Sequence, residues 1–179
     1  MFEKAVGKAR VEINAAYPLY DAVRWQPKWT ITKYADQDAY ARGESYETIS
    51  ITHNLLLNEG INAAWTLICG GGGTAFTNAA AYIGVGDDAT GAAATQTGLQ
   101  AAVNKLYKAM DVSYPTYGTL QKATWRSTFL AAEANFAWNE ITVANGNSDA
   151  STNLNRLVQA VGTKASPGVW TVSLEITLS

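Results

Sequence analysis

Apolar and polar residues alternate along several segments from residue 25 onward. In residues 25–34, Trp29, Ile31 and Lys33 fall on one face, with threonines between them. A period of two indicates a strand with one buried face. Pro27 has no backbone N–H, so this strand is expected to begin after it or to lie at a sheet edge. The other predicted strands span residues 45–52, 80–86, 105–110, 122–130, 135–144, 154–160 and 169–179.

Residues 54–68 carry the one convincing helical pattern of the chain. Asn54 is a suitable N-cap, because its side chain can accept a hydrogen bond from an amide of the first turn. Gly60 weakens the middle of this helix and is a place where it can kink. The glycine run at 70–73 is expected to end it. The apolar stripe of this helix consists of Leu55, Leu56, Ile61, Ala64, Trp65 and Ile68.

Around eight strands with one short helix, over residues 54–68, are the count expected of a two-sheet architecture. The sequence therefore predicts an all-β fold, a jelly-roll-like antiparallel β-sandwich, over residues 25–179. Two connecting segments are expected to have no regular structure. They are residues 35–45, interpreted as a polar loop, and residues 113–118, interpreted as a turn.

Residues 1–24 differ from the rest, because no period of two or 3.6 persists in them. Pro18 would end any helix before it. This segment is interpreted as an N-terminal arm that lies along a neighbouring molecule. A disordered tail is the alternative, and the aromatic pair Tyr17 and Tyr20 favours an arm that docks.

Composition narrows the classes of partner. Charged residues make up only 16% of the 179 residues and the formal net charge is −2, with lysines and arginines scattered. A phosphate backbone requires a concentrated basic face, so nucleic acid is not an expected partner. No apolar run reaches the roughly 20 residues of a membrane span, and the N-terminus shows no signal peptide. We expect synthesis in the cytoplasm of the producing cell, no membrane partner, and packing of weakly charged surfaces against neighbours.

Catalytic and cofactor motifs are absent from the sequence. His53 is the only histidine, and no G-x-S-x-G motif accompanies it. The glycine run at 70–73 lacks the lysine of a phosphate-binding loop and follows a helix rather than preceding one. Asn145, Asn147 and Asp149 imitate half of a calcium loop without its later glycine and glutamate. The sequence therefore predicts no enzyme activity, no catalytic residue, no cofactor and no metal.

Acidic residues leave two weaker possibilities open. Asp87 and Asp88 could join a weak calcium site at a loop tip, although Asx turns are the simpler interpretation. Glu133 and Glu140 are the carboxylates to consider for glycoside hydrolysis, which depends on their separation in space. Glu140 interrupts an apolar strand, so a buried carboxylate there needs a cationic partner. Arg126 and Arg156 are the candidates, and a structural ion pair is the expected outcome.

Aromatic residues divide into two predicted groups. Trp29, Trp65, Trp125 and Trp170 lie on apolar stripes and are expected in the core. Cys69, the only cysteine, is expected to be a small buried residue. Aromatic residues near the arm, loops and strand ends are the candidates for a contact surface: Tyr17, Tyr20, Trp25, Tyr40, Tyr114 and Tyr117.

Ten sequence blocks occur in an order and spacing that resemble one family of small structural proteins of tailed-phage virions. They cover about residues 25–179 and read WQPKWTITKY, NLLLNEGI, GGGGTAF, AYIGVGD, TQTGLQAAVNK, YKAMDVSYP, TWRSTF, EANFAWNEITVANG, NLNR and WTVSLEITL. The resemblance implies a self-associating, non-enzymatic virion component with a β-sandwich fold. Similar sandwich modules also occur as the attachment domains of tail-fibre and baseplate proteins, where a long fibrous or receptor-binding region follows them.

The resemblance favours a capsid decoration (cement) protein on the exterior of the shell. Its expected partners are the major capsid protein and copies of itself, as a homotrimer at the threefold sites of an icosahedral shell. A tail, baseplate or fibre-attachment protein is the alternative within the virion. A carbohydrate-binding module or small glycosidase that uses exposed tryptophans is the alternative of another class.

Overall fold

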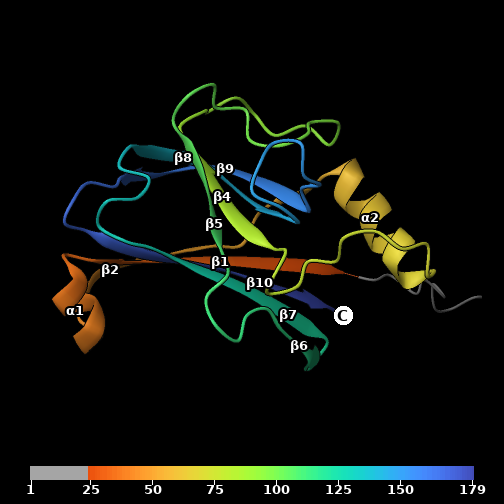
Figure 1. The fold of residues 1–179 in the computed structure, drawn as a ribbon, viewed down its shortest axis with the longest axis horizontal. Helices are drawn as coiled ribbons and strands as arrows, with labels where there is room; N and C mark the ends of the chain where they lie inside the picture. Colours follow the sequence, from red (N-terminus) through yellow and green to blue (C-terminus); the bar gives the residue numbers. More distant parts are fainter. Residues whose placement is uncertain (1–23) are drawn as a thin grey trace, which may run out of the picture.

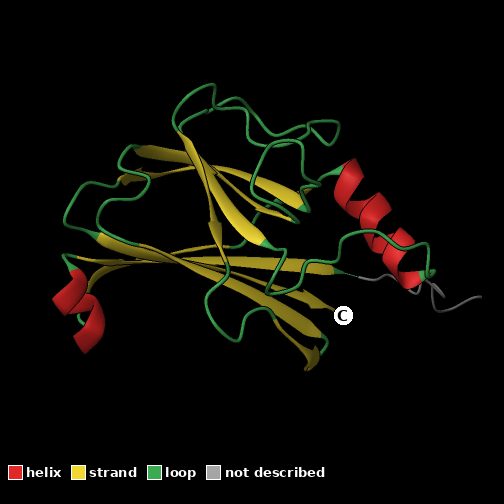
Figure 2. Ribbon diagram, viewed as in Figure 1, coloured by secondary structure: helices red, strands yellow, loops and turns green. Residues whose placement is uncertain are grey.

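A computed structural model of the chain describes residues 24–179 as two antiparallel β-sheets packed face to face (Figures 1 and 2). The first sheet has the order β2-β1-β10-β7-β6, and the second has the order β3-β9-β8-β4-β5. The first sheet comprises β1 (Trp25–Tyr34), β2 (Ser45–Ile51), β6 (Thr116–Thr119), β7 (Lys122–Phe129) and β10 (Val169–Leu178). The second comprises β3 (Leu55–Leu56), β4 (Tyr82–Gly86), β5 (Lys105–Ala109), β8 (Ala137–Ala144) and β9 (Asn155–Thr163).

The pairing of early strands with late strands confirms the predicted jelly-roll-like sandwich. β1 pairs with β10 along its whole length, from Trp25 opposite Leu178 to Tyr34 opposite Val169. In the second sheet the short β3 pairs with β9. In both sheets a strand from the first part of the chain therefore pairs with a strand from the last part, as in a jelly roll.

The core lies between the sheets and follows the alternation of the sequence. Trp29 and Ile31 of β1 are fully buried against residues of the second sheet such as Ile141. Trp138 stands edge-on to both Phe129 and Trp170, with ring centroids 4.8 Å apart in each pair. Edge-to-face packing is a favoured aromatic geometry. Trp29, Trp125 and Trp170 are thus buried, as the sequence predicted.

Pro27 lies inside β1, which is not an edge strand. It stands opposite Ile176 of β10, but β2 pairs with β1 only from Trp29 onward. The side of Pro27 that lacks an N–H therefore meets no strand in the described chain. The expectation that the strand begins after Pro27 is wrong. Proline is tolerated at this position because β2 ends before it, so no neighbouring strand needs a hydrogen bond from residue 27.

The predicted helix over 54–68 begins four residues later than expected. Leu55 and Leu56 form β3, and helix α2 spans Asn58–Ile68. Leu57 occupies the N-cap position without a side-chain hydrogen bond, so Asn54 is not the cap. The sequence signal of a cap was overridden because Leu55 and Leu56 pair with Arg156 and Asn155 of β9.

The two segments expected to be irregular contain regular structure. Residues 35–45 include a second helix, α1 (Gln37–Arg42), so the prediction of one helix is wrong. The Asp36 side chain accepts a hydrogen bond of 2.8 Å from the Ala39 N–H, and Gly43 ends the helix at φ 72°. These are the usual start and stop signals of a helix. Residues 113–118 are not only a turn, because β6 begins within them.

Candidate functional site

Helix α2 is attached to the sandwich through its first turn. Leu57 is fully buried, and its N–H donates to the Leu154 carbonyl at 3.2 Å. The Asn58 N–H donates to the Ala94 carbonyl at 2.8 Å. A Cβ atom at Gly60 would stand 2.3 Å from the Leu154 oxygen, so only glycine permits this close approach. The start of α2 is therefore fixed tightly on the chain that enters β9.

The rest of α2 lies at one end of the sandwich, opposite the end that carries α1 (Figure 1). Two large residues of its predicted apolar stripe are uncovered: Trp65 is 62% exposed and Ile68 is 74% exposed. The prediction that Trp65 belongs to the core is wrong. Cys69 follows the helix and is exposed too, which corrects the expectation of a buried cysteine. Helix α2 lies beyond the ends of the strands of the second sheet (Figure 1), and no strand within residues 24–179 covers Trp65 or Ile68.

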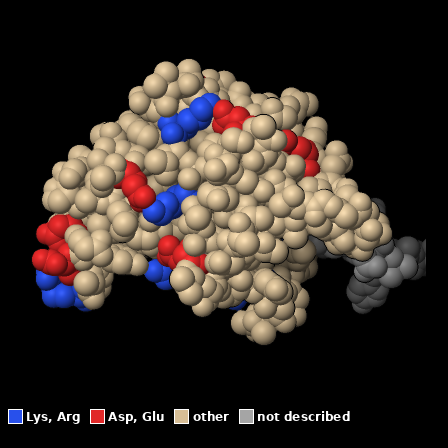
Figure 3. All heavy atoms as spheres, viewed as in Figure 1, with Lys and Arg blue, Asp and Glu red and all other residues tan. Residues whose placement is uncertain are grey.

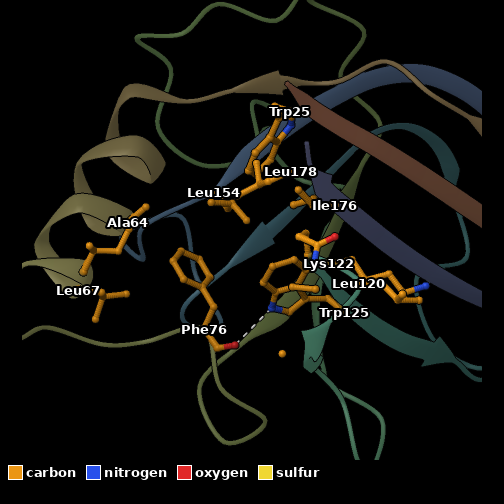
Figure 4. Close-up of a pocket in the computed structure, with 14 residues that line it drawn as sticks. Trp25, Ala64, Leu67, Phe76, Leu120, Lys122, Trp125, Leu154, Ile176 and Leu178 are labelled. Carbon is orange, nitrogen blue, oxygen red and sulfur yellow. Dashed lines mark hydrogen bonds between the residues drawn. The ribbon is translucent and has the colours of Figure 1, made fainter. Parts of the chain in front are cut away.

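An apolar groove of about 740 Å³ separates α2 from the end of the first sheet. Figure 4 shows Ala64 and Leu67 of α2 facing Phe76 and Trp125 across this groove. The volume falls within the range of pockets that hold drug-sized ligands or apolar side chains. Its remaining apolar lining comes from Trp25 of β1, Ile68, Leu120, Ala123, Leu154, Ile176 and Leu178.

The walls of the groove differ in how far their side chains are buried and hydrogen-bonded. Trp125 is held in place, because its Nε1 donates to the Phe76 carbonyl at 3.3 Å (dashed line in Figure 4). Leu120 lies in the turn between β6 and β7, where it has a positive φ of 54° and is 71% exposed. A positive φ is uncommon for a residue other than glycine. The turn therefore presents a large apolar side chain at the rim, on the side of the groove opposite α2 (Figure 4).

Charged residues are sparse around this end of the molecule. On the face shown in Figure 3 the surface over α2 is mostly free of charged residues, with acidic atoms only near the start of the helix. Depletion of charge together with exposed aromatic and aliphatic residues is the compositional signature of the centre of an interface. We name this surface, formed by the groove and the exposed residues Ile61, Trp65 and Ile68, the α2 surface.

Two of the predicted contact residues belong to the α2 surface or border it. Trp25 lines the groove. Tyr117 of β6 is 77% exposed and precedes Gly118, which also lines the groove. Tyr17 and Tyr20 lie outside the described residues. Phe76, Leu120 and Leu178 line the groove but were not predicted as contact residues. The sequence feature that could have identified this wall is an apolar residue, Leu120, within a turn.

The other two predicted contact residues have partners within the subunit. The ring of Tyr40 in α1 packs edge-on against Tyr34, with centroids 5.2 Å apart. The ring of Tyr114 lies under the Arg126 guanidinium, 5.4 Å from the ring centroid to Cζ, and packs against the core. The structure does not bring Tyr40 or Tyr114 to the α2 surface, because neither lines the groove.

Glu140 is a buried carboxylate with the cationic partner that its position requires. The Arg156 Nε donates to it at 2.7 Å, and both side chains are fully buried. The Gln100 N–H donates to the same oxygen, Oε2, at 3.0 Å, and the Ala101 N–H donates to Oε1 at 2.8 Å. The Glu140 carboxylate thus accepts from three protein donors and is fully buried, which leaves it inaccessible to a substrate. It forms a structural ion pair with Arg156, as predicted.

Arg156 also fixes the long loop that joins β4 to β5. Its Nη1 donates to the Thr90 carbonyl at 2.8 Å and to Gln96 Oε1 at 3.0 Å, and its Nη2 pairs with Asp88 at 3.2 Å. The Thr90 N–H and then Arg156 hold the pKa of Asp88 below its usual value. Asp87 accepts from the Asn104 amide at 2.7 Å. Both aspartates of the suggested calcium site are therefore engaged internally.

The remaining candidate carboxylates have cations of their own. Glu133 accepts from Lys108 at 2.5 Å and from the Leu130 N–H at 2.8 Å. Burial raises its pKa, but these two donors outweigh burial and leave the pKa below its ordinary value. Asp149 accepts from Lys105 and from the Tyr107 hydroxyl.

His53 is exposed between β2 and β3. Within residues 24–179 no group of three or more His, Cys, Asp or Glu side chains is close enough to hold a metal ion.

Neither helix in the described part of the chain is long and apolar enough to span a membrane. Comparison with family models, with curated proteins and with solved structures finds no match to this chain. The resemblance to phage virion proteins therefore stays a prediction. The site consists of an apolar groove and exposed apolar residues of α2, and the buried Glu140 and Arg156 pair with each other inside the protein.

Proposed function

We propose that this chain is a non-enzymatic structural protein of a tailed-phage virion, a capsid decoration protein that binds and stabilises the assembled shell. The observation that supports an assembly role is the α2 surface, where exposed apolar residues of the helix stand beside a groove of about 740 Å³ whose lining is apolar apart from Gln121 and Lys122. The resemblance of the sequence blocks supports the virion as the place of assembly.

The α2 surface would act through cohesion. Burying a large apolar side chain contributes about 1.5–3 kcal/mol. Burial of the exposed Trp65, Ile68 and Leu120 at a contact would therefore favour association substantially. Losses of translational and side-chain freedom offset part of this gain. Many linked contacts of modest affinity can nevertheless hold a shell together through effective concentration. The partners of this proposal are the major capsid protein and copies of the chain itself, as a homotrimer on the exterior of the shell.

A tail, baseplate or fibre-attachment role is the second candidate, since the same sandwich and surface would suit it. Copy number separates the two roles, because a decoration protein occurs in hundreds of copies per particle and a baseplate protein in a handful. A sugar-binding module would need flat, exposed aromatic rings. Of the tryptophans in residues 24–179, Trp65 alone is strongly exposed, whereas Trp29, Trp125, Trp138 and Trp170 are buried.

Quantitative mass spectrometry of purified particles tests the proposal. The ratio of this chain to the major capsid protein should be near unity or a simple fraction. A ratio far below that moves the protein to the tail or baseplate. Absence from particles contradicts both virion roles, and a glycan-binding screen then tests the sugar-binding alternative.

A further inference from the structure

We propose that the groove beside α2 receives residues 17–20, the YPLY segment, of a second copy of the chain. The assignment deepens the proposed function and rests on its self-association, but it does not depend on the virion as the location. It identifies which part of a neighbouring subunit covers the α2 surface and makes the N-terminal arm the connector between subunits.

The arm begins where the groove lies. Arg24, the first described residue, exchanges hydrogen bonds with Ser179: its N–H donates to the Ser179 carbonyl at 2.7 Å, and the Ser179 N–H donates back at 3.2 Å. The β1–β10 ladder thus continues through Arg24, directly beside the groove-lining Trp25 and Leu178. The 23 residues that precede Arg24 can span up to roughly 80 Å when extended, enough to cross to a neighbour.

The sequence before Arg24 favours a neighbouring groove over the subunit's own. For Tyr20 to return to the groove beside Trp25, the chain would have to reverse within residues 21–23, which read Asp-Ala-Val. Of these three residues only Asp21 is a common turn residue, and the β-branched Val23 favours extended backbone over a tight reversal. A chain that leaves Arg24 in the extended direction instead carries the YPLY segment away from its own sandwich.

The YPLY segment matches the groove in chemistry. Two tyrosines and Leu19 supply large apolar bodies for a lining of Ala64, Leu67 and Phe76. Tyrosine also carries a hydroxyl that must reach a polar atom when its ring is buried. Gln121 and Lys122 are the polar residues of the lining. Pro18 restricts the segment before binding, which lowers the entropy cost of docking.

Exchange of arms between identical subunits also meets the size requirement of a stable interface. A standard interface buries about 1,200–2,000 Å² in total. Aromatic side chains bury about 150–250 Å² each, so one YPLY segment alone is too small. A reciprocal or cyclic exchange repeats the contact in every subunit and covers Ile68, which lines the groove and is exposed in the single subunit.

A disulfide trap tests both the occupant and its origin. Leu19→Cys and Ala64→Cys are combined in the full chain with Cys69→Ser, so that the two new thiols are the only ones. Oxidation should give covalent dimers and higher species on a non-reducing gel. The control places the second cysteine at Asn62, which is exposed on the opposite side of α2, and should give no such species. A monomer with an internal disulfide between the two new cysteines would show that the arm docks in its own groove and would overturn docking in a neighbour. Two unreacted thiols would overturn docking in the groove altogether.

Charge substitutions separate this inference from the proposed function. Leu19→Asp and Ala64→Asp should each raise the dissociation constant of self-association at least about tenfold, since a charge would be desolvated in an apolar contact. Asn62→Asp and Ala5→Asp add the same charge elsewhere and should leave it unchanged. Unaltered urea midpoints would show that the variants fold. Weakening by Ala64→Asp but not by Leu19→Asp would overturn the arm as occupant, while the assembly role and the particle copy number would still stand.

Discussion

Replacing Arg156 with leucine should destabilise the protein far more than a surface substitution. The change leaves the Glu140 carboxylate fully buried without its cation, although the Gln100 and Ala101 N–H groups still donate to it. It also removes the contacts to Thr90 and Gln96, which hold the loop between β4 and β5.

The expected loss is about 3–5 kcal/mol, the range for breaking a buried pair by removing one partner. Marginal proteins have only about 5–15 kcal/mol in total, so this is a large share of the free energy of unfolding. At about 2–4 °C per kcal/mol for a domain of this size, Tm should fall by about 6–20 °C.

Urea unfolding followed by tryptophan fluorescence measures the change. Arg42→Leu is the matched control, because Arg42 pairs with Glu44 at 2.9 Å on the surface, with 58% and 62% of the two side chains exposed. That control should shift the free energy of unfolding by less than about 1 kcal/mol.

The double variant Glu140→Leu/Arg156→Leu removes both charges and should recover most of the loss, since apolar replacements of buried pairs are often neutral. A loss for Arg156→Leu no greater than that for Arg42→Leu would refute the buried-pair reasoning. Failure of the double variant to recover would show that loop attachment, rather than an uncompensated charge, sets the cost.

Two further predictions concern packing and pH. Gly60→Ala should destabilise by about 1–3 kcal/mol through overpacking against the Leu154 carbonyl, instead of gaining the helix propensity of alanine; a higher urea midpoint would contradict the close approach. Burial, and then the hydrogen bond to Asp149, raises the pKa of Tyr107 well above its ordinary value of 10.0. The folded state therefore keeps a proton that the unfolded state releases, so this contribution is complete below pH 10 and lost as the pH rises above it. The urea midpoint of wild type should fall more steeply above pH 10 than that of Tyr107→Phe, and parallel profiles would exclude this origin.

The strands were predictable because burial of one face imposes a period of two. The long strands β1, β7 and β10 lie where alternation predicts them, and the buried Glu140 required a cation that Arg156 supplies. Helix α1 was missed because six residues hold too little periodicity, although Asp36 and Gly43 were its start and stop signals.

Exposure of the α2 stripe could not be predicted from the sequence. The stripe identifies a face of the helix, but Trp65 and Ile68 are uncovered because α2 lies beyond the ends of the strands of the second sheet. That depends on where Leu57 and Gly60 fix the helix on Leu154, which is a tertiary contact. An apolar stripe that is not used in the core is the basis of the assembly role proposed above.

The central claim is that copies of the chain associate through the α2 surface. Light scattering over a series of concentrations measures the molar mass of the wild-type chain and of Trp65→Gln/Ile68→Gln. Both positions are exposed, so the variant should fold normally. We expect a wild-type mass at a small integral multiple of 19.1 kDa and a variant that dissociates at concentrations where the wild type does not. A wild-type chain that stays at 19.1 kDa throughout, or a variant with the same association as wild type, would contradict it.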